Sequence, residues 1–462
     1  MIASSAPPGA RLRRPLAELL LVAAVCASWA NALDGPFQFD DFNVIVDNPR
    51  VHSLAAWARG VSSGIRPLLN LSYTLNWLIS PSAWGFHLAN VVLHAANTVL
   101  AHDVSLALGL ARPAALVAAL LFGLHPIQTE AVTYVSGRSV SLMACGYLAS
   151  LLAYMRACQG SRGWHAASVA CFGAALATKE VAVTLPLVLL TYEAATGPRG
   201  GWPAAWRRVS PHGILLGIGL LLFAASPRYR LLLGVSTDLR SPLENVLVQL
   251  DALAYLVRRL LYPVGLCIDP ALPVMLGLSP SRSLAALVVL VAFVLAIAGL
   301  PRWPVAGFAV LWFFLLLIPT NSLLARADVV NERQIYLAAL GPFVLLALGL
   351  ERLRQRYPPA LFLALALPAC LAAATVARNE DYRSEVSLWR STVRVAPHNV
   401  RAWNNLAWAW HLAGCWDQAE AAYAEALRLA PDHPGVLANR DALYVARATL
   451  APGGATCASL GP

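Results

Sequence analysis

The chain has 462 residues, of which 58% are hydrophobic and only 13% are charged, and its mean hydropathy is +0.61. A soluble domain carries about a quarter charged residues, so this composition excludes an ordinary soluble protein and predicts a membrane protein. In such a protein a formal net charge of +10 more often sets the topology than binds nucleic acid. The eight cysteines show no metal-ligand spacing, and we predict neither a metal site nor a disulfide framework.

Long apolar runs predict a multi-pass helical protein with about eleven membrane spans. The runs begin near residues 15, 86, 111, 139, 164, 181, 212, 282, 303, 334 and 358. The first run follows the basic segment 11–14 and ends near the signal-peptidase-like Ala30-Asn31-Ala32, but a retained first span fits the later spans better than a cleaved signal peptide. Charged and polar residues interrupt the run over 246–262, so we expect it to lie at the membrane surface.

The arginine-rich connections predict how the chain is oriented. They lie at residues 11–14, 156–162, 199–208, 302 and 351–356. Because basic loops favour the cytoplasm, the N-terminus is expected inside and everything after about residue 378 outside. The remaining polar segments then share the outer face. Heavy use of arginine with one lysine, Lys179, favours a bacterial cytoplasmic membrane, with an endoplasmic reticulum membrane as the alternative for a eukaryotic source.

The composition changes after residue 377, which separates a membrane domain (1–377) from a helical module (378–448). Val400–His433 fits the 34-residue tetratricopeptide (TPR) pattern, in which small residues let two antiparallel helices approach and large ones fill the gap. We expect Trp403, Leu406, Tyr423 and Ala426 to be buried in that gap. The module is expected to contact an acceptor or partner, and the tail 449–462 is predicted to be disordered.

The segment "FQFDDFNVIVDNPRV" places two adjacent carboxylates, Asp40 and Asp41, just after the first apolar run. A hydrated turn is one interpretation, because Asp, Asn and Pro favour turns. The other is a catalytic pair. Burial and a neighbouring carboxylate both raise the pKa of an acid, which suits it to acid–base work near neutrality.

Other ionisable residues interrupt apolar sequence at positions expected on the outer face. Such residues are costly in a membrane and usually functional. One function that buried cations can have is to stabilise a phosphate leaving group, which they do best where water is scarce. The non-functional interpretations are a polar connector between helices, a surface turn in which an acid and a base neutralise each other, and a side chain that anchors a helix at the membrane interface. The amphipathic segment from Arg66 to Trp77 is expected to lie on the outer surface, with Arg66 contacting lipid headgroups. The substrate-binding candidates are His125, Glu130, Arg138, Lys179, Glu180, Glu332 and Arg333.

Several stretches in this order resemble the TMTC-type family of protein O-mannosyltransferases, which have a GT-C glycosyltransferase fold. They are "FDDFNVIVDNPRV", "RPLLNLSYTLNW", "GFHLANVVLHAANTVL", "LFGLHPIQTEAVTYVSGRSVSL", "ATKEVAVTLPLVLL" and "NERQIYLA", followed by the TPR segment. The resemblance implies an inverting transfer of a sugar, mannose in this family, from a polyprenyl- or dolichyl-phosphate donor to a protein hydroxyl. No other cofactor is implied. Asp40 would be the general base, and Asp41 would orient the acceptor or share that role.

The chain departs from the family in its TPR region, where it carries barely one full repeat instead of a long array. This leaves the protein acceptor more open than the fold. A membrane-anchored TPR adaptor without catalysis is one alternative, although a single helix would suffice as its anchor. A glycosyltransferase acting on a glycan or lipid is another. A transporter would place charges near mid-membrane, whereas here they gather at helix ends.

Overall fold

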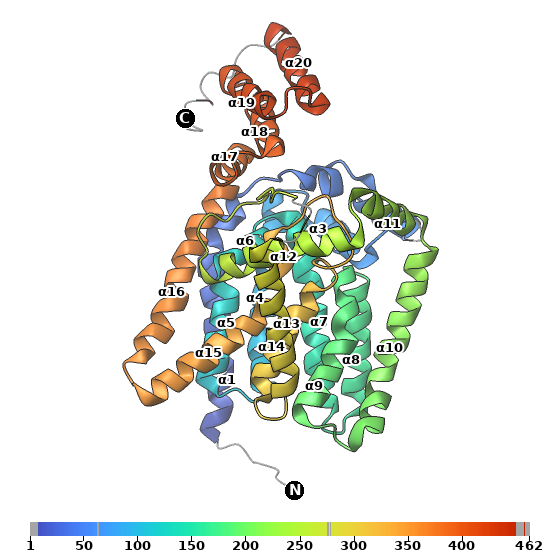
Figure 1. Ribbon diagram of the computed structural model, residues 1–462, viewed down its shortest axis with the longest axis vertical. Coiled ribbons are helices and arrows are strands. Elements are labelled where there is room, and N and C mark those ends of the chain that lie inside the picture. The colour runs from blue at the N-terminus through green and yellow to red at the C-terminus, as the bar shows by residue number, and fades with distance from the viewer. Residues whose placement is uncertain (1–7, 62–63, 275–276, 278, 450–456, 458–462) are drawn as a thin grey trace.

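The computed structural model describes residues 8–61, 64–274, 277, 279–449 and 457. The protein is 79% helical, and the described residues contain no strand. Long helices form a bundle. Helix α1 (Pro8–Ser28) begins at one end of the bundle, and the C-terminal helices project from the opposite end (Figure 1). The predicted all-α fold with a C-terminal helical module is therefore confirmed.

Each predicted apolar run overlaps a long helix of this bundle. After α1 these helices are α4 (Ala83–Ala107), α5 (Arg112–Leu124), α7 (Arg138–Ala157), α8 (Arg162–Leu176), α9 (Leu185–Thr196), α10 (Gly201–Ala225), α13 (Pro280–Gly299), α14 (Pro304–Leu317), α15 (Leu340–Arg356) and α16 (Ala360–Asn379).

By length and composition alone, fewer helices qualify as membrane spans than the sequence predicts. In the described part of the chain four qualify: Val135–Ala157, Gly201–Ala225, Pro280–Gly299 and Ala360–Tyr382. A fifth is possible if Arg112–Leu124 and Pro126–Val132, bent by 49°, form one broken span. These apolar helices fit a membrane protein, but the count of about eleven spans is not confirmed.

Helix α4 illustrates why hydropathy undercounts the helices of the bundle. It has 25 residues, but several of them are polar and point into the protein. His94 Nδ1 lies 2.8 Å from the Tyr336 hydroxyl, and Asn97 donates to the Ser141 carbonyl oxygen at 2.8 Å. Because α4 packs against α1, α5 and α7, its polar groups find partners inside the protein and need not face lipid.

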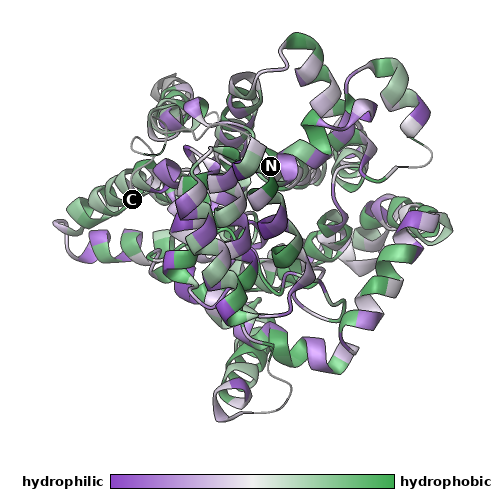
Figure 2. Ribbon diagram, turned by 90° about the horizontal axis from the view of Figure 1, so that it is seen from above, coloured by the Kyte–Doolittle hydropathy of each residue, from purple (hydrophilic) through white to green (hydrophobic). Residues whose placement is uncertain are grey.

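The peripheral helices show the opposite pattern. Leu287, Val291 and Leu295 of α13 are exposed at the bundle surface, and the view from above in Figure 2 shows hydrophobic residues along the outer helices. Apolar side chains without protein contacts are expected where a helix borders lipid. The outer wall of the bundle is therefore suited to a hydrocarbon environment.

Other helices cover the end of the bundle from which the C-terminal helices project. They include α3 (Pro67–Ile79), α6 (Thr129–Val132), α11 (Pro227–Leu239) and α12 (Pro242–Leu261). Helix α12 contains most of the interrupted run 246–262 and lies across the bundle end instead of along the bundle (Figure 1). The Ser241 side chain and Glu244 form a capping box that starts α12, which satisfies N–H groups that a helix start leaves unpaired.

The C-terminal module consists of α17 (Glu385–Val395), α18 (Val400–Leu412), α19 (Trp416–Leu429) and α20 (Pro434–Thr449). Leu406, Tyr423 and Ala426 are buried between the paired helices, as the repeat pattern predicts. The prediction for Trp403 is wrong, because this residue is only half-buried. Its indole N–H donates to the Pro397 carbonyl oxygen at 2.8 Å, so the ring lies over the preceding turn instead of filling the gap.

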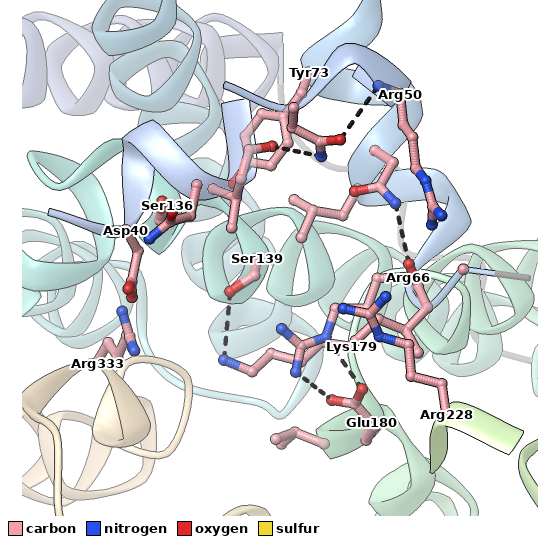
Figure 3. A pocket seen from close by; sticks show the side chains of 18 of the residues that line it. Asp40, Arg50, Arg66, Tyr73, Ser136, Ser139, Lys179, Glu180, Arg228 and Arg333 are labelled. Atoms are coloured by element: carbon pink, nitrogen blue, oxygen red, sulfur yellow. Dashed lines mark hydrogen bonds and ion pairs between the residues drawn. The ribbon is translucent and has the colours of Figure 1, made fainter. Parts of the chain in front are cut away.

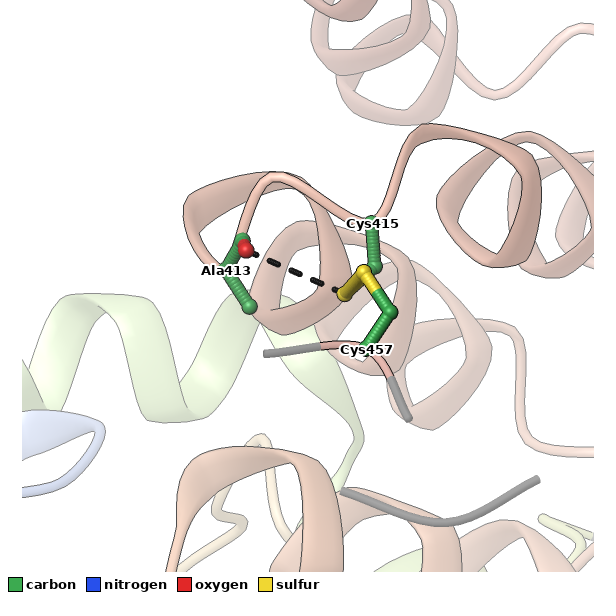
Figure 4. The surroundings of a disulfide bond; sticks show 3 residues. All are labelled: Ala413, Cys415 and Cys457. Carbon is green, nitrogen blue, oxygen red and sulfur yellow. Dashed lines mark hydrogen bonds between the residues drawn. A yellow bond between two sulfur atoms is a disulfide. The ribbon is translucent and has the colours of Figure 1, made fainter. Parts of the chain in front are cut away.

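A disulfide joins Cys415 to Cys457 (Figure 4), which the cysteine pattern did not predict. The two residues are 42 positions apart, and a single pair at this distance has no diagnostic spacing. The bridge ties the chain after α20 to the turn between α18 and α19. The rest of the tail predicted to be disordered, beyond Thr449, lies outside the described residues.

Arg401, in the first turn of α18, attaches the module to two loops of the bundle. Its guanidinium donates to the carboxylates of Asp269 and Asp328, both at 2.7 Å. Next to it, the Asn399 side-chain amide donates to the Asp269 backbone carbonyl at 3.0 Å. The repeat is therefore docked on the bundle through polar contacts.

We expect Arg401→Ala to loosen this docking. Asp269 is only 9% exposed, and a buried acceptor that loses its partner costs about 1–3 kcal/mol. Hydrogen exchange of the α18 amides should accelerate. Arg428→Ala is the matched control, because its pair with Glu425 lies on the surface and such pairs contribute little. Equal protection of α18 in the two variants would contradict the docking role of Arg401.

Candidate active site

A cavity of about 520 Å³ opens among the elements that cover the bundle end (Figure 3). Three polar segments that are far apart in the sequence meet on its wall, contributing Asp40, Lys179 and Arg333. Among the described residues, its cationic wall residues are Arg50, Arg66, Lys179, Arg228, Arg326 and Arg333, and its carboxylates are Asp40 and Glu180. This excess of positive charge favours an anionic ligand.

The two adjacent acids of the first segment have different surroundings. Asp41 is 1% exposed and does not line the cavity. Its carboxylate accepts hydrogen bonds from the backbone N–H of Ser136 at 2.8 Å, from the Ser136 hydroxyl and from the backbone N–H of Gln38 at 3.0 Å. Burial raises the pKa of Asp41 to about 7 against the opposing effect of these bonds. Asp41 therefore fastens its loop to the start of α7.

Asp40, by contrast, lies on the cavity wall and is half-buried. Its backbone N–H donates to the Tyr134 hydroxyl at 3.0 Å, and Asp40 lines the cavity. Figure 3 shows the Asp40 carboxylate and the Arg333 guanidinium pointing toward each other. Of the two predicted catalytic acids, Asp40 is the one that a ligand can reach.

Glu130 holds Arg333 in place from behind the wall. The Glu130 side chain is 1% exposed, accepts the Arg333 backbone N–H at 2.9 Å and lies 3.4 Å from its Nε. The guanidinium also lies over the Tyr134 ring, 5.8 Å from its centroid. Glu130 thus acts on the site through Arg333 and does not line the cavity itself.

Lys179 and Glu180 are both on the wall but differ in their partners. Lys179 Nζ is 3.4 Å from the Ser139 hydroxyl. Burial and the surrounding cations, first among them Arg66, hold the pKa of Lys179 well below its usual range. Glu180 accepts two hydrogen bonds from Arg66, at 2.9 and 3.1 Å, and one from Tyr229 at 3.0 Å. Burial alone would raise the pKa of Glu180, but Arg66 outweighs it and the pKa falls to about 2.

The structure does not bring two further candidates, His125 and Arg138, to the cavity. His125 is buried, and its Nε2 lies 3.0 Å from the Leu260 carbonyl oxygen. Arg138 is also buried and donates to the side-chain oxygens of Asn90 at 2.7 Å and Asn76 at 2.9 Å. Both residues therefore join secondary-structure elements inside the protein.

Glu332 also lies away from the cavity, although it precedes Arg333 in the sequence. It is 1% exposed and accepts hydrogen bonds from the Tyr255 hydroxyl at 3.0 Å and the Cys267 backbone N–H at 2.8 Å. Consecutive residues here point to opposite sides of the segment. Glu332 fastens α12 and the following loop, whereas Arg333 reaches the cavity.

Some wall residues were not among the sequence-predicted site residues. Arg66 was expected to contact lipid headgroups, but it pairs with Glu180 across 114 positions of sequence. Its left-handed backbone, with φ of +56°, precedes Pro67 and directs the chain into α3. Arg326 donates to the Asn331 side chain at 3.3 Å, whereas Arg50 and Arg228 are exposed. The proline after Arg66 was a local signal for a turn, but nothing in the spacing of these arginines predicts a shared cavity.

Among the described residues, no group of three or more His, Cys, Asp or Glu side chains is arranged to hold a metal ion.

Comparisons with known proteins identify what the chain is similar to. The tetratricopeptide repeat family model matches residues 400–433. The chain is 27% identical over 490 residues to "Protein O-mannosyl-transferase TMTC3" of Mus musculus, covering 92% of this chain and 52% of that protein. It is 28% identical over 511 residues to "Protein O-mannosyl-transferase TMTC1" of Homo sapiens, covering 92% and 56%. The resemblance to the TMTC-type family is confirmed.

The chain spans about half the length of these TMTC-type relatives. The TMTC3 protein of Drosophila melanogaster follows the same pattern, with 26% identity over 92% of this chain and 56% of that protein. Three of the TMTC-type segments quoted from the sequence supply Asp40, Lys179 and Arg333 to one cavity. The resemblance and the cavity therefore single out the same part of the molecule.

Proposed function

We propose that this protein is an integral-membrane glycosyltransferase. It would transfer mannose from a polyprenyl- or dolichyl-phosphate donor to a hydroxyl of a protein acceptor on the non-cytoplasmic side. The names of its relatives support the sugar and the acceptor class. The observation that carries the proposal is the cationic cavity with one accessible acid. Of its two carboxylates, Glu180 is held by Arg66 and Tyr229, whereas Asp40 faces the cavity.

One side of the cavity suits the acceptor hydroxyl and the other suits the phosphate of the donor. Asp40 lies on one side with Arg333, and Lys179, Arg66 and Arg228 gather on the other (Figure 3). Inversion at a sugar carbon requires the base on the face opposite the leaving group. We therefore place the donor phosphate beside Lys179 and Arg228, and the sugar between them and Asp40. Asp40 removes the proton of the acceptor hydroxyl as its oxygen bonds to the sugar carbon, and the lipid phosphate leaves toward the cations.

The phosphate side of the cavity also borders apolar surface. Arg228 belongs to α11, whose next turn exposes Leu231, Leu232 and Leu233. A lipid-linked donor needs its charged head in a cationic cavity and its chain in an apolar environment. The sequence of α11 supplies both within a few residues, which supports a lipid-linked donor over a free nucleotide sugar.

Two observations support the non-cytoplasmic placement. The arginine-rich connections favour the cytoplasm for the opposite end of the bundle. The Cys415–Cys457 disulfide joins the chain after α20 to the C-terminal module, which projects from the end of the bundle opposite these connections (Figure 1), and disulfides persist in oxidising compartments. We propose that the cavity and residues 378–448 both lie on the non-cytoplasmic side, and that the module contacts the protein acceptor or a partner.

The test is a transfer assay with purified protein in lipid nanodiscs. Mannose supplied as a polyprenyl-phosphate ester should appear on a serine- and threonine-containing polypeptide, whereas guanosine diphosphate mannose should give no product. Transfer from the nucleotide sugar alone would contradict the proposed donor. Absence of transfer from either donor to polypeptide, glycan or lipid acceptors would favour a membrane-anchored TPR adaptor.

A further inference from the structure

The helix that precedes the repeat, α17, contacts the loop that carries Asp40. The Phe39 backbone N–H donates to Glu385 Oε1 at 2.7 Å. The Phe39 ring packs edge-on against Trp389, with 5.1 Å between ring centroids. Glu385 and Trp389 are one turn apart and share a face of α17. The side-chain amide of Gln38 adds a hydrogen bond of 2.7 Å to the carbonyl oxygen of Tyr382, just before α17.

The contacts with α17 stabilise an unusual conformation, because the backbone of Phe39 is left-handed, with φ of +49°. This conformation is strained for a residue with a side chain and persists only where the surroundings over-determine it. Here the backbone N–H and the ring are both held by α17. The conformation of Phe39 sets the direction in which the chain leaves toward Asp40, the next residue.

We propose that α17 positions the general base, and that Glu385 is a positioning residue of the transfer reaction acting through Phe39 and Asp40. The inference rests on the proposed function. It makes the start of the C-terminal module part of the active-site scaffold, in addition to any contact that the repeat makes with an acceptor. Without the Glu385 bond, Phe39 can relax to an ordinary backbone conformation, and Asp40 turns away from the acceptor hydroxyl.

The first experiment compares Glu385→Ala with Glu385→Gln. Misplacement of a catalytic group by about 1 Å can lower a rate about 100-fold. We expect Glu385→Ala to lower kcat about 10- to 100-fold with the KM for the lipid donor unchanged. Glu385→Gln should retain most of kcat, because its amide oxygen still accepts the Phe39 N–H. Glu425→Ala, which removes a surface carboxylate from α19, is the control and should match the parent.

The decisive experiment combines Glu385→Ala with Asp40→Asn. If Glu385 acts through Asp40, Glu385→Ala should have little further effect on the residual rate of Asp40→Asn. The same loss in both backgrounds would overturn the positioning role. Parent-like kcat in Glu385→Ala, with a large effect of Asp40→Asn, would overturn the inference and leave the proposed function standing. Parent-like kcat in Asp40→Asn itself would instead refute the proposed base.

A second variant keeps the inference testable if Glu385→Ala unfolds. Combining Phe39→Gly with Glu385→Ala removes the ring, the hydrogen bond to Glu385 and the cost of a left-handed backbone, so the loop should fold without that bond to α17. We expect the same loss of kcat at an unchanged KM for the donor. Parent-like kcat in a folded protein with both substitutions would overturn the proposal.

Discussion

Asp40→Asn should lower the turnover number about 10²- to 10⁴-fold, which is the usual contribution of general base catalysis. The amide has nearly the same shape as the carboxylate but cannot accept the proton of the acceptor hydroxyl. Donor binding should remain close to that of the parent, because Asp40 lies on the side of the cavity away from Lys179 and Arg228 (Figure 3). Initial rates of transfer and donor titrations on the same purified samples measure the two effects.

Two neighbouring variants show whether this effect belongs to Asp40. Asp47→Asn is the matched control, because Asp47 is exposed on the same segment and does not line the cavity. It should turn over like the parent. Asp41→Asn should act on loop stability, since Asp41 bonds to Ser136 and Gln38 behind the wall. A larger loss of turnover in Asp41→Asn than in Asp40→Asn, with both proteins folded, would contradict the assignment of the base.

Lys179→Ala should weaken donor binding about 10- to 100-fold, because a hydrogen bond to a charged group contributes about 1.5–3 kcal/mol. Among the described residues, the hydrogen bond of the Lys179 ammonium is a 3.4 Å contact with Ser139, so the ammonium is available to a phosphate. Lys179→Arg keeps the charge and should bind the donor within a few-fold of the parent. Arg59→Ala, at an exposed position outside the cavity wall, is the control. Parent-like affinity in Lys179→Ala would contradict the placement of the phosphate.

The same lysine predicts how donor binding depends on pH. Burial and the nearby arginines lower the pKa of Lys179 in the empty cavity, and a bound phosphate should raise it again by favouring the charged form. Donor binding then takes up a proton. The affinity for the donor should therefore fall as the pH rises through the pKa that Lys179 has in the empty cavity. A sugar phosphodiester has no proton of its own to exchange near neutrality. Lys179→Arg should abolish the dependence, and a dependence that persists would assign it to another group.

The sequence predicted the parts of the structure that depend on local spacing. Val400–His433 forms the expected helical hairpin because the repeat pattern places its small and large residues one turn apart. Asp40, Lys179 and Arg333 stood out because ionisable residues are rare in apolar sequence. The positions of His125 and Arg138 carried the same signal, but their side chains bond inside the protein. Sequence alone does not separate a buried polar bond from a site.

Other features depend on contacts between distant segments. Which of the adjacent acids faces the cavity follows from the left-handed backbone of Phe39, and α17 secures that conformation from about 346 positions along the chain. The partner of Arg66 is Glu180, 114 positions away. The disulfide partner of Cys415 lies in a tail that its composition predicts to be disordered. Periodicity carries no information about such pairings.

The central claim is that Asp40 accepts the proton in a transfer from a lipid-linked donor held in this cavity. It is tested most directly by a single-turnover experiment on parent and Asp40→Asn proteins saturated with radiolabelled polyprenyl-phosphate mannose. After rapid addition of acceptor polypeptide, the parent should move the label to the polypeptide, while Asp40→Asn should keep it on the bound donor for at least 100 times longer. Transfer at the parent rate by Asp40→Asn, with the donor equally bound, would contradict the claim.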